Sequence, residues 1–275
     1  TLEHPRPLVY FTAGRSSFLD GGIWIYGLDP YTGEVLHQNR LEGPYPGSYE
    51  KERDSIETLD NAMNMDGAKS NILVGDGSNN LYLYQKRFKS DLTRDSTAEH
   101  LITIGGFLDN TYKEGFYWTY RGNWPGFNTR LLGRSEYGQL LVFNEKAVFG
   151  DHVMTENYRV RRGFTPGEGE RLFAREHGVS KDRWSKKIPL RVRGMVLAGK
   201  KLFVAGAPDV VPEDDPLAAY EGRAGAVLVA VSSKKGEKLG NELQLETPPV
   251  FDGLIAAQKR LYMSNTKGEV LCFGK

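Results

Sequence analysis

The sequence predicts an all-β fold built from repeated antiparallel sheets. The pattern is clearest in residues 22–42, GIWIYGLDPYTGEVLHQNRLE, where two strand-like runs flank the turn 29–33. In that turn Pro30 presets φ and Gly33 accepts a positive φ, which is typical of a hairpin connection. Related hairpin patterns occur at residues 71–88, 138–149, 226–245 and 260–273. Short strands that recur with the same kind of turn indicate a repeat β architecture.

The remaining elements, in chain order, are mostly short strands. Residues 7–13 form the first strand-like run, and residues 55–66 fit either a short helix or two strands with a loop. From residue 184 the strands follow one another regularly, at 184–190, 191–199, 201–208, 226–233, 237–246, 249–265 and 269–275. Grouped by threes and fours, the strands give five to six four-stranded blades, which predicts a β-propeller.

Both ends of the chain lack one strand in this scheme. The first unit begins at a strand equivalent to residues 201–204, and the last unit stops after residues 270–273. Because unpaired sheet edges promote aggregation, we expect the ends to complete one blade together, or the chain to be the C-terminal part of a larger propeller. Residues 1–275 then form a single propeller domain, incomplete at the N-terminus, whose missing blades come from the parent chain or from another chain.

Composition excludes several classes of protein. The formal net charge is +1, which provides no global attraction for nucleic acid. The basic run 186–193 is interrupted by apolar residues and is interpreted as a strand with a solvated basic face. Cys272 is the only cysteine, so neither a disulfide within the chain nor a multi-cysteine zinc site can form, and we expect a half-buried thiol. No stretch approaches the ~20 apolar residues of a transmembrane segment.

Two segments carry a family resemblance. IYGLDPYTGEVL and RLYMSNTKGEVLCFG resemble the repeat of pyrroloquinoline-quinone-like (PQQ-like) β-propellers, in which Asp-x-x-Thr-Gly-x-x-Leu follows an apolar strand; the second segment matches in part. Segments such as GGFLDN and RVRGMVLAGKKLFVAGAPDVV are similar to the C-terminal half of large propeller proteins of planctomycete-type bacteria. The resemblance implies four-stranded blades and a periplasmic, extracellular or cell-envelope location. It does not imply a bound quinone.

A PQQ-dependent dehydrogenase is one functional alternative. In enzymes of the family that this chain resembles, the quinone stacks between a tryptophan and a vicinal disulfide beside an oxygen-ligated Ca²⁺. A single cysteine excludes that disulfide, and Trp24 and Trp118 lie in β-rich runs where core packing is the commoner role. The acidic turn 213–215 and the scattered histidines lack the spacing of metal ligands. We therefore predict no metal site and assign no cofactor; PQQ with Ca²⁺ remains an alternative without a clear site.

A carbohydrate-active enzyme, or a sugar-binding propeller with its site at the channel mouth, is the second alternative. The segment 117–124, YWTYRGNW, combines flat aromatic faces suited to sugar rings with a guanidinium suited to carboxylates. A second polar cluster lies in the loop 14–22, and loops on a rigid scaffold commonly carry binding sites. Packing of the aromatic residues between blades is the competing interpretation. The predicted ligand-binding residues are Arg15, Asp20, Trp118, Tyr120, Arg121 and Trp124; no catalytic residue is assigned.

The favoured function is a non-catalytic binding or scaffold module of an exported bacterial protein. Such a module needs a rigid rim and loops rather than catalytic residues. The irregular loops 43–54, 89–99 and 208–225 would supply the contact surface. We expect a protein or a carbohydrate as the partner and no nucleic acid.

Overall fold

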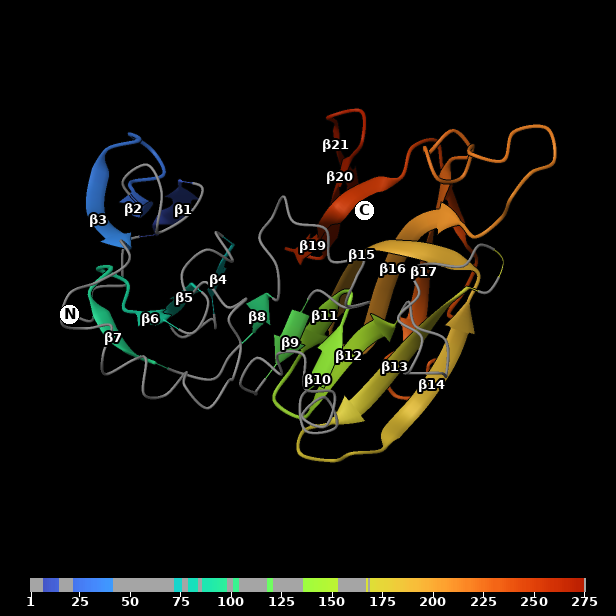
Figure 1. Ribbon diagram of the computed structural model, residues 1–275, viewed down its shortest axis with the longest axis horizontal. Helices are drawn as coiled ribbons and strands as arrows, with labels where there is room; N and C mark the ends of the chain where they lie inside the picture. The colour runs from blue at the N-terminus through green and yellow to red at the C-terminus, as the bar shows by residue number, and fades with distance from the viewer. Residues whose placement is uncertain are drawn as a thin grey trace, which may run out of the picture. The chain divides into compact units, whose positions relative to one another are not determined.

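The computed structural model describes residues 7–14, 22–41, 72–75, 79–83, 86–97, 101–103, 118–120, 136–152, 167 and 169–274. The described residues are β-strands, turns and loops (Figure 1). The chain divides into two compact units, residues 1–110 with 119–135 and residues 111–118 with 136–275. No helix in the described segments is long and apolar enough to cross a membrane.

The strands follow one another closely along the chain. In the first unit they are β1 (Val9–Ala13), β2 (Ile23–Leu28), β3 (Val35–Leu41), β4 (Leu73–Gly75), β5 (Leu81–Leu83), β6 (Lys86–Phe88), β7 (Arg94–Thr97) and β8 (Ile102–Thr103). β9 (Trp118–Tyr120) lies at the division between the units. The second unit holds β10 (Glu136–Gly138), β11 (Leu141–Phe143), β12 (Ala147–His152), β13 (Glu170–Glu176), β14 (Asp182–Ile188), β15 (Leu190–Ala198), β16 (Lys201–Pro208), β17 (Ala226–Ser232), β18 (Leu243–Leu245), β19 (Pro249–Ala257), β20 (Arg260–Asn265) and β21 (Val270–Phe273).

Consecutive strands pair with each other in antiparallel sheets. The four-stranded sheets are β4-β5-β6-β7, β11-β12-β13-β14 and β15-β16-β17-β18, and the three-stranded sheets within a unit are β1-β2-β3 and β19-β20-β21. A four-stranded antiparallel sheet whose strands are adjacent in sequence is the repeating blade of a propeller. The predicted all-β fold with propeller-type blades is therefore confirmed.

The predicted hairpin turn is held by its own side chains. The Asp29 carboxylate accepts the backbone N–H of Tyr31 at 2.8 Å, and Gly33 has a φ of 73°. Asn265 builds the equivalent turn in the last sheet, where its Oδ1 accepts the backbone N–H of Lys267 at 3.0 Å. A short acceptor side chain at the start of the turn replaces a backbone hydrogen-bond partner, so asparagine serves as well as aspartate.

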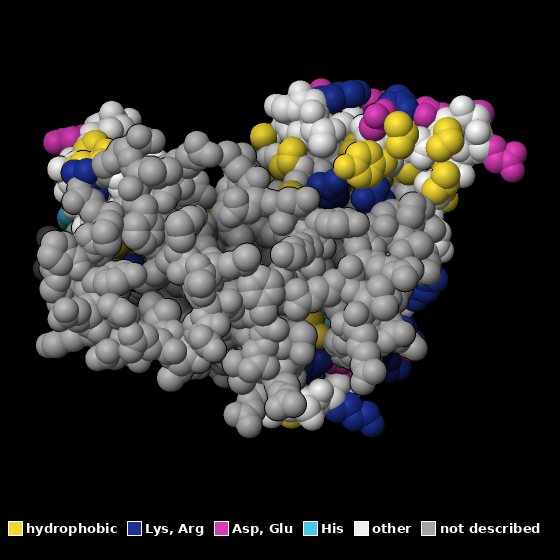
Figure 2. Space-filling view, viewed as in Figure 1, with side chains coloured by type: hydrophobic (Ala, Val, Ile, Leu, Met, Phe, Trp, Pro, Cys, Tyr) yellow, Lys and Arg dark blue, Asp and Glu magenta, His cyan; other side chains and the backbone are white. Residues whose placement is uncertain are grey.

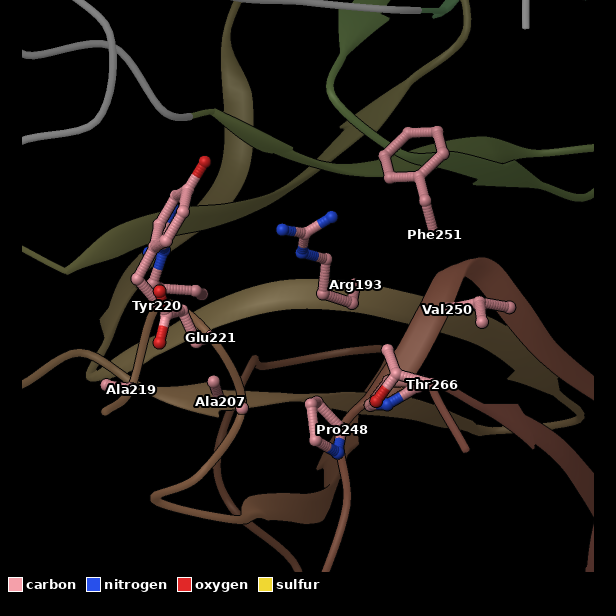
Figure 3. Close-up of a pocket in the computed structure, with 12 residues that line it drawn as sticks. Arg193, Ala207, Ala219, Tyr220, Glu221, Pro248, Val250, Phe251 and Thr266 are labelled. Atoms are coloured by element: carbon pink, nitrogen blue, oxygen red, sulfur yellow. The ribbon is translucent and has the colours of Figure 1, made fainter. Parts of the chain in front are cut away.

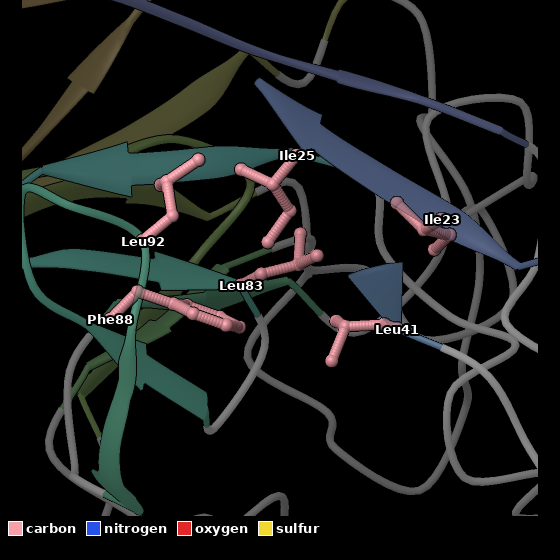
Figure 4. Packing of buried hydrophobic residues seen from close by; sticks show 6 residues of the cluster. All are labelled: Ile23, Ile25, Leu41, Leu83, Phe88 and Leu92. Atoms are coloured by element: carbon pink, nitrogen blue, oxygen red, sulfur yellow. The ribbon is translucent and has the colours of Figure 1, made fainter. Parts of the chain in front are cut away.

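Alternation along the strands builds the core of the first unit. Ile23 and Ile25 project from the same face of β2 and are buried. They join Leu41, Leu83, Phe88 and Leu92 in one cluster (Figure 4). Full burial of such a side chain stabilises the fold by roughly 1.5–3 kcal/mol, so this cluster holds the sheets of the unit together.

In the second unit, a tryptophan connects two successive sheets. Trp184 on β14 donates its indole N–H to the carbonyl of Ser233, in the turn after β17, at 3.0 Å. A Cβ on Gly236 would lie 2.5 Å from the Trp184 ring, and Gly236 has a φ of 69°. Both the turn conformation and the ring packing therefore require glycine at this position.

The structure corrects the expectation for Cys272, which is exposed rather than half-buried. On β21 the side chains alternate, and Leu271 and Phe273 are the residues that pack against the core of the sheet. Cys272 lies between them in sequence, so its side chain points to the opposite face.

Candidate anion-binding pocket

Of the six predicted ligand-binding residues, two are described. Trp118 and Tyr120, both on β9, are buried. The other four, Arg15, Asp20, Arg121 and Trp124, lie outside the described residues. A ligand-binding role for this group therefore stays a prediction, and the site developed below is built from other residues.

β15 carries a bulge at an arginine. Val192 pairs with Gly206 of β16 and Gly194 pairs with Ala205, so Arg193 is an extra residue without a cross-strand partner. Bulges bend a strand, redirect side chains and occur preferentially beside functional sites. Gly206 permits the distortion, because a Cβ there would overlap the carbonyl oxygen of Arg191.

β19, whose residues contact β15 extensively, is more irregular. Pro249 pairs with Asn265 and Leu254 pairs with Met263, so residues 250–253 stand opposite Ser264 alone. Within this bulge Asp252 has a φ of 58°, which is unusual for a residue other than glycine. The two neighbouring strands are therefore both distorted next to the same cavity.

A pocket of about 240 Å³ lies between these two bulges and the loop that joins β16 to β17 (Figure 3). It is lined by Arg191, Arg193, Ala207, Ala219, Tyr220, Glu221, Gly222, Pro248, Pro249, Val250, Phe251 and Thr266. Figure 3 shows the Arg193 guanidinium between the side chains of Tyr220 and Phe251. The walls are thus mainly apolar and aromatic, with two guanidinium groups among them.

The two arginines have different surroundings. The Arg191 guanidinium lies over the Tyr220 ring, 4.9 Å from its centroid, in a cation–π contact. Burial, followed by repulsion from Arg193, lowers the pKa of Arg191 below its ordinary value. Arg193 is half-buried, and among the described residues its side chain has no hydrogen-bond or ion-pair partner. Two like charges are therefore held together in a partly enclosed space, where an anion would stabilise both.

One carboxylate lines the same pocket. Glu221 forms an ion pair with Arg223, which also donates two hydrogen bonds to Asp215 at 3.0 and 2.7 Å. The lining itself therefore carries two positive charges and one negative charge. This balance suits a ligand with a single negative charge better than a polyanion.

A buried pair of carboxyl groups supports the arginine strand. Glu170 on β13 accepts the backbone N–H of Val192 at 2.7 Å, and Asp151 on β12 accepts that of Leu140 at 2.7 Å. Both carboxyl groups are buried, and Asp151 Oδ2 has no hydrogen-bond partner among the described residues. Burial raises the pKa of Asp151 to about 7, and burial followed by repulsion from Asp151 raises that of Glu170 well above its ordinary value.

Catalysis by this carboxyl pair does not fit the geometry. Glycoside hydrolysis needs two carboxyl groups with access to the substrate, whereas Asp151 and Glu170 are 0% and 5% exposed. Within the described part of the chain, no group of three or more His, Cys, Asp or Glu side chains is arranged to hold a metal ion. The arrangement at the pocket can bind and orient an anion.

The sequence pattern contained a partial signal for this pocket. The run 186–193 spans the end of β14 and the start of β15 rather than one strand. Lys186 and Lys187 are exposed as predicted, but Arg191 and Arg193 are half-buried and line a pocket. The error arose because the run gives no sign of the bulge at Arg193 or of the neighbouring bulge in β19, and these distortions create the cavity.

No protein-family profile and no curated protein sequence matches the chain. Among solved structures, BamB from Moraxella catarrhalis is similar at 15% identity and a TM-score of 0.40, over 94% of this chain and 67% of that one. The dihydro-heme d1 dehydrogenase NirN in complex with DHE has 13% identity and a TM-score of 0.39, over 98% and 52%. TolB from Acinetobacter baumannii has 12% identity and a TM-score of 0.21, over 95% and 78%.

These three proteins are β-propellers of the PQQ-like or WD40-like kind, in agreement with the predicted resemblance. At TM-scores below 0.5, the fold assignment rests on the strand order of this chain, and no function is transferred from them.

Proposed function

We propose that this chain is a non-catalytic binding module that holds the carboxylate of a ligand with an apolar body in the pocket between β15 and β19. The observation that carries the proposal is the pair formed by Arg191 and Arg193, two guanidinium groups kept together in a half-buried pocket without a described counter-ion for Arg193. A planar carboxylate matches the donor geometry of guanidinium groups and neutralises their mutual repulsion.

The rest of the pocket lining indicates what kind of chemical group carries the carboxylate of the ligand. Ala207, Ala219, Pro248, Pro249, Val250 and Phe251 supply apolar surface. Besides the arginines, only Thr266, Tyr220 and Glu221 add polar side-chain atoms to the lining, and Glu221 already pairs with Arg223. A sugar ring would leave several hydroxyl groups without partners here, and each unpaired buried polar group weakens binding. These features support a monocarboxylate with an aliphatic or aromatic body over a carbohydrate.

The proposed module would serve as a binding or scaffold part of an exported protein. A location in the periplasm, outside the cell or in the cell envelope, and bacterial export itself, belong to this proposal and rest on the sequence resemblance. No feature of the described residues favours a dehydrogenase.

Saturation-transfer-difference NMR with N-acetylphenylalanine tests this function. Its neutral amide, N-acetylphenylalaninamide, is the matched control ligand, because it has the same body without the carboxylate. We expect saturation transfer to the acid and little to the amide. Loss of a charge-assisted hydrogen bond costs roughly 1.5–3 kcal/mol, so Arg193→Ala should weaken binding of the acid by about tenfold or more.

The control protein is Lys186→Ala, which removes one exposed positive charge on β14, away from the pocket lining. It should bind N-acetylphenylalanine as the wild type does. Equal binding of the acid and the amide, or unchanged binding by Arg193→Ala, would overturn the proposal.

A further inference from the structure

The loop that joins β16 to β17 exposes an unusual number of apolar side chains. Val210, Val211, Leu217 and Tyr220 are 48%, 51%, 55% and 64% exposed. Isolated exposed apolar residues are common, but several in one loop beside a pocket indicate an interaction surface. Figure 2 shows hydrophobic side chains close to both basic and acidic ones at the upper right, on the visible face of the second unit.

This loop is held in place by its own polar contacts. At its start the buried Asp209 carboxylate accepts the backbone N–H groups of Gly167, at 3.0 Å, and of Gly169. Further along, the Asp215–Arg223 pair closes the loop, and Ala218 and Ala219 are buried beneath it. The exposed apolar side chains are therefore presented on an ordered backbone, which reduces the entropy lost when a partner binds.

The exposed loop and the pocket form one continuous surface. Tyr220 belongs to both, because its ring packs against Arg191 and lines the pocket while much of the residue remains exposed. Val250, itself 37% exposed, lines the pocket from β19. A ligand whose apolar part extends out of the pocket therefore contacts further apolar surface.

We infer that this continuous surface docks an extended segment of another protein, with an Asp or Glu carboxylate in the pocket and neighbouring apolar side chains on the loop. The inference rests on the proposed function, since it uses the same pocket. A free small carboxylate would fill the pocket but leave Val210, Val211 and Leu217 uncovered. A polyanion is disfavoured by Glu221 in the lining and by the exposed Glu213 and Asp214 on the loop.

Selection of a random dodecapeptide library on the wild-type chain tests the inference. We expect the enriched peptides to share an acidic residue next to Leu, Val, Ile, Phe or Tyr. One enriched peptide and its counterpart with Asn or Gln in place of the acid are then synthesised with a fluorescent label. By fluorescence anisotropy, the acidic peptide should bind at least tenfold more tightly than its amide counterpart and than N-acetylphenylalanine.

Two protein variants separate the loop from the pocket. Val210→Ser with Val211→Ser removes exposed apolar surface but no pocket lining, so it should weaken the peptide about tenfold and leave binding of N-acetylphenylalanine unchanged. Arg193→Ala should weaken both ligands, and Lys186→Ala neither.

The outcomes are distinguishable. If N-acetylphenylalanine binds through Arg193 but no peptide binds more tightly, or the loop variant binds peptide as the wild type does, the docking inference is wrong and the proposed function stands. If the enriched peptides need no acidic residue and Arg193→Ala binds both ligands normally, both are wrong.

Discussion

Glu170 on β13 accepts the backbone N–H of Val192 on β15 at 2.7 Å, and Val192 lies between Arg191 and Arg193 in the chain. The carboxyl group that makes this bond is buried, and burial followed by repulsion from Asp151 raises its pKa well above the ordinary value. Because an unpaired buried N–H or carboxyl oxygen costs free energy, this hydrogen bond fixes the position of Val192 relative to β13. The strand segment that carries both pocket arginines is therefore held in place by a hydrogen bond to a buried side chain before any ligand binds.

The carboxyl pair predicts a specific pH dependence of stability. Because the pKa of Asp151 is raised from 3.8 to about 7, the folded state binds its proton more tightly than the unfolded state does. The resulting stabilisation is present at low pH and is lost as the pH rises from about 4 to about 7. Asp151→Asn can keep the acceptor for the backbone N–H of Leu140 and has no titrating proton to lose.

The measurement is urea denaturation of wild type and Asp151→Asn at about pH 4.5 and about pH 7.5. Relative to the variant, the wild type should lose a few kcal/mol in free energy of unfolding over this interval, since each unit of pKa difference corresponds to about 1.4 kcal/mol. Asp215→Asn is the control. The hydrogen bond with Arg223 lowers the pKa of Asp215, so the contribution of Asp215 to the free energy of unfolding stays constant between about pH 4.5 and about pH 7.5. Parallel pH profiles for wild type and Asp151→Asn would contradict the prediction.

The bulge in β15 should require glycine at position 206. The φ of Gly206 is ordinary, so an alanine is excluded by the carbonyl oxygen of Arg191 rather than by backbone conformation. Gly206→Ala should therefore lower the free energy of unfolding by about 2 kcal/mol or more, within the range of overpacking, and weaken N-acetylphenylalanine binding by displacing Arg191.

Gly75→Ala on β4 is the matched control for this prediction. Gly75 also has an ordinary φ, and among the described residues a Cβ there would contact only the carbonyl oxygen of Asn80, at 4.0 Å. Replacement should be neutral or stabilising by about 0.4–1 kcal/mol, because alanine restricts the unfolded chain. Chemical denaturation of both variants gives the comparison, and equal effects would show that the close contact at Gly206 does not determine stability.

The fold was predictable where local sequence determines local geometry. The Asp29–Gly33 turn and the alternation of Ile23 and Ile25 both act through neighbouring residues, and both appear in the structure as expected. Asn265 extends the rule, because its side chain makes the same turn without the Asp-x-x-Thr-Gly pattern. Repeats of such hairpins were sufficient to predict propeller-type blades.

The candidate site was not predictable in the same way, because it depends on cross-strand register. Arg193 is an extra residue because Val192 pairs with Gly206 while Gly194 pairs with Ala205. No local sequence pattern specifies which residues pair across two strands. Tyr220 reaches Arg191 from a loop almost thirty residues away in the chain. Pattern analysis therefore selected the dense aromatic segment 117–124 and assigned the basic strand to solvent.

His152 should remain neutral well below the usual pKa of histidine. Its ring stacks on Tyr137 at 4.9 Å and packs against Phe173 at 4.4 Å, and burial lowers its pKa from 6.5 to about 4. A lowered histidine pKa stabilises the fold above about pH 6.5, and this stabilisation is lost as the pH falls toward about 4. Ring ¹⁵N resonances, assigned with His152→Asn, should show a neutral imidazole at about pH 5.5. A doubly protonated His152 ring at about pH 5.5 would refute the assignment of burial as the dominant influence on the pKa of this residue.

Glu221→Gln should strengthen carboxylate binding in the pocket. The substitution removes the one negative charge of the lining, while Arg223 keeps its two hydrogen bonds with Asp215. Partly exposed charges interact by about 0.2–1 kcal/mol, so we expect a gain of up to about fivefold in affinity for N-acetylphenylalanine, measured by NMR titration. Because screening lengths fall from about 10 Å at 0.1 M salt to about 3 Å at 1 M, the gain should shrink at high salt. Glu242→Gln, which disrupts an exposed pair with Lys238 outside the lining, should leave the affinity unchanged. An equal gain in both variants would mean that net charge, rather than the charge within the pocket, controls binding.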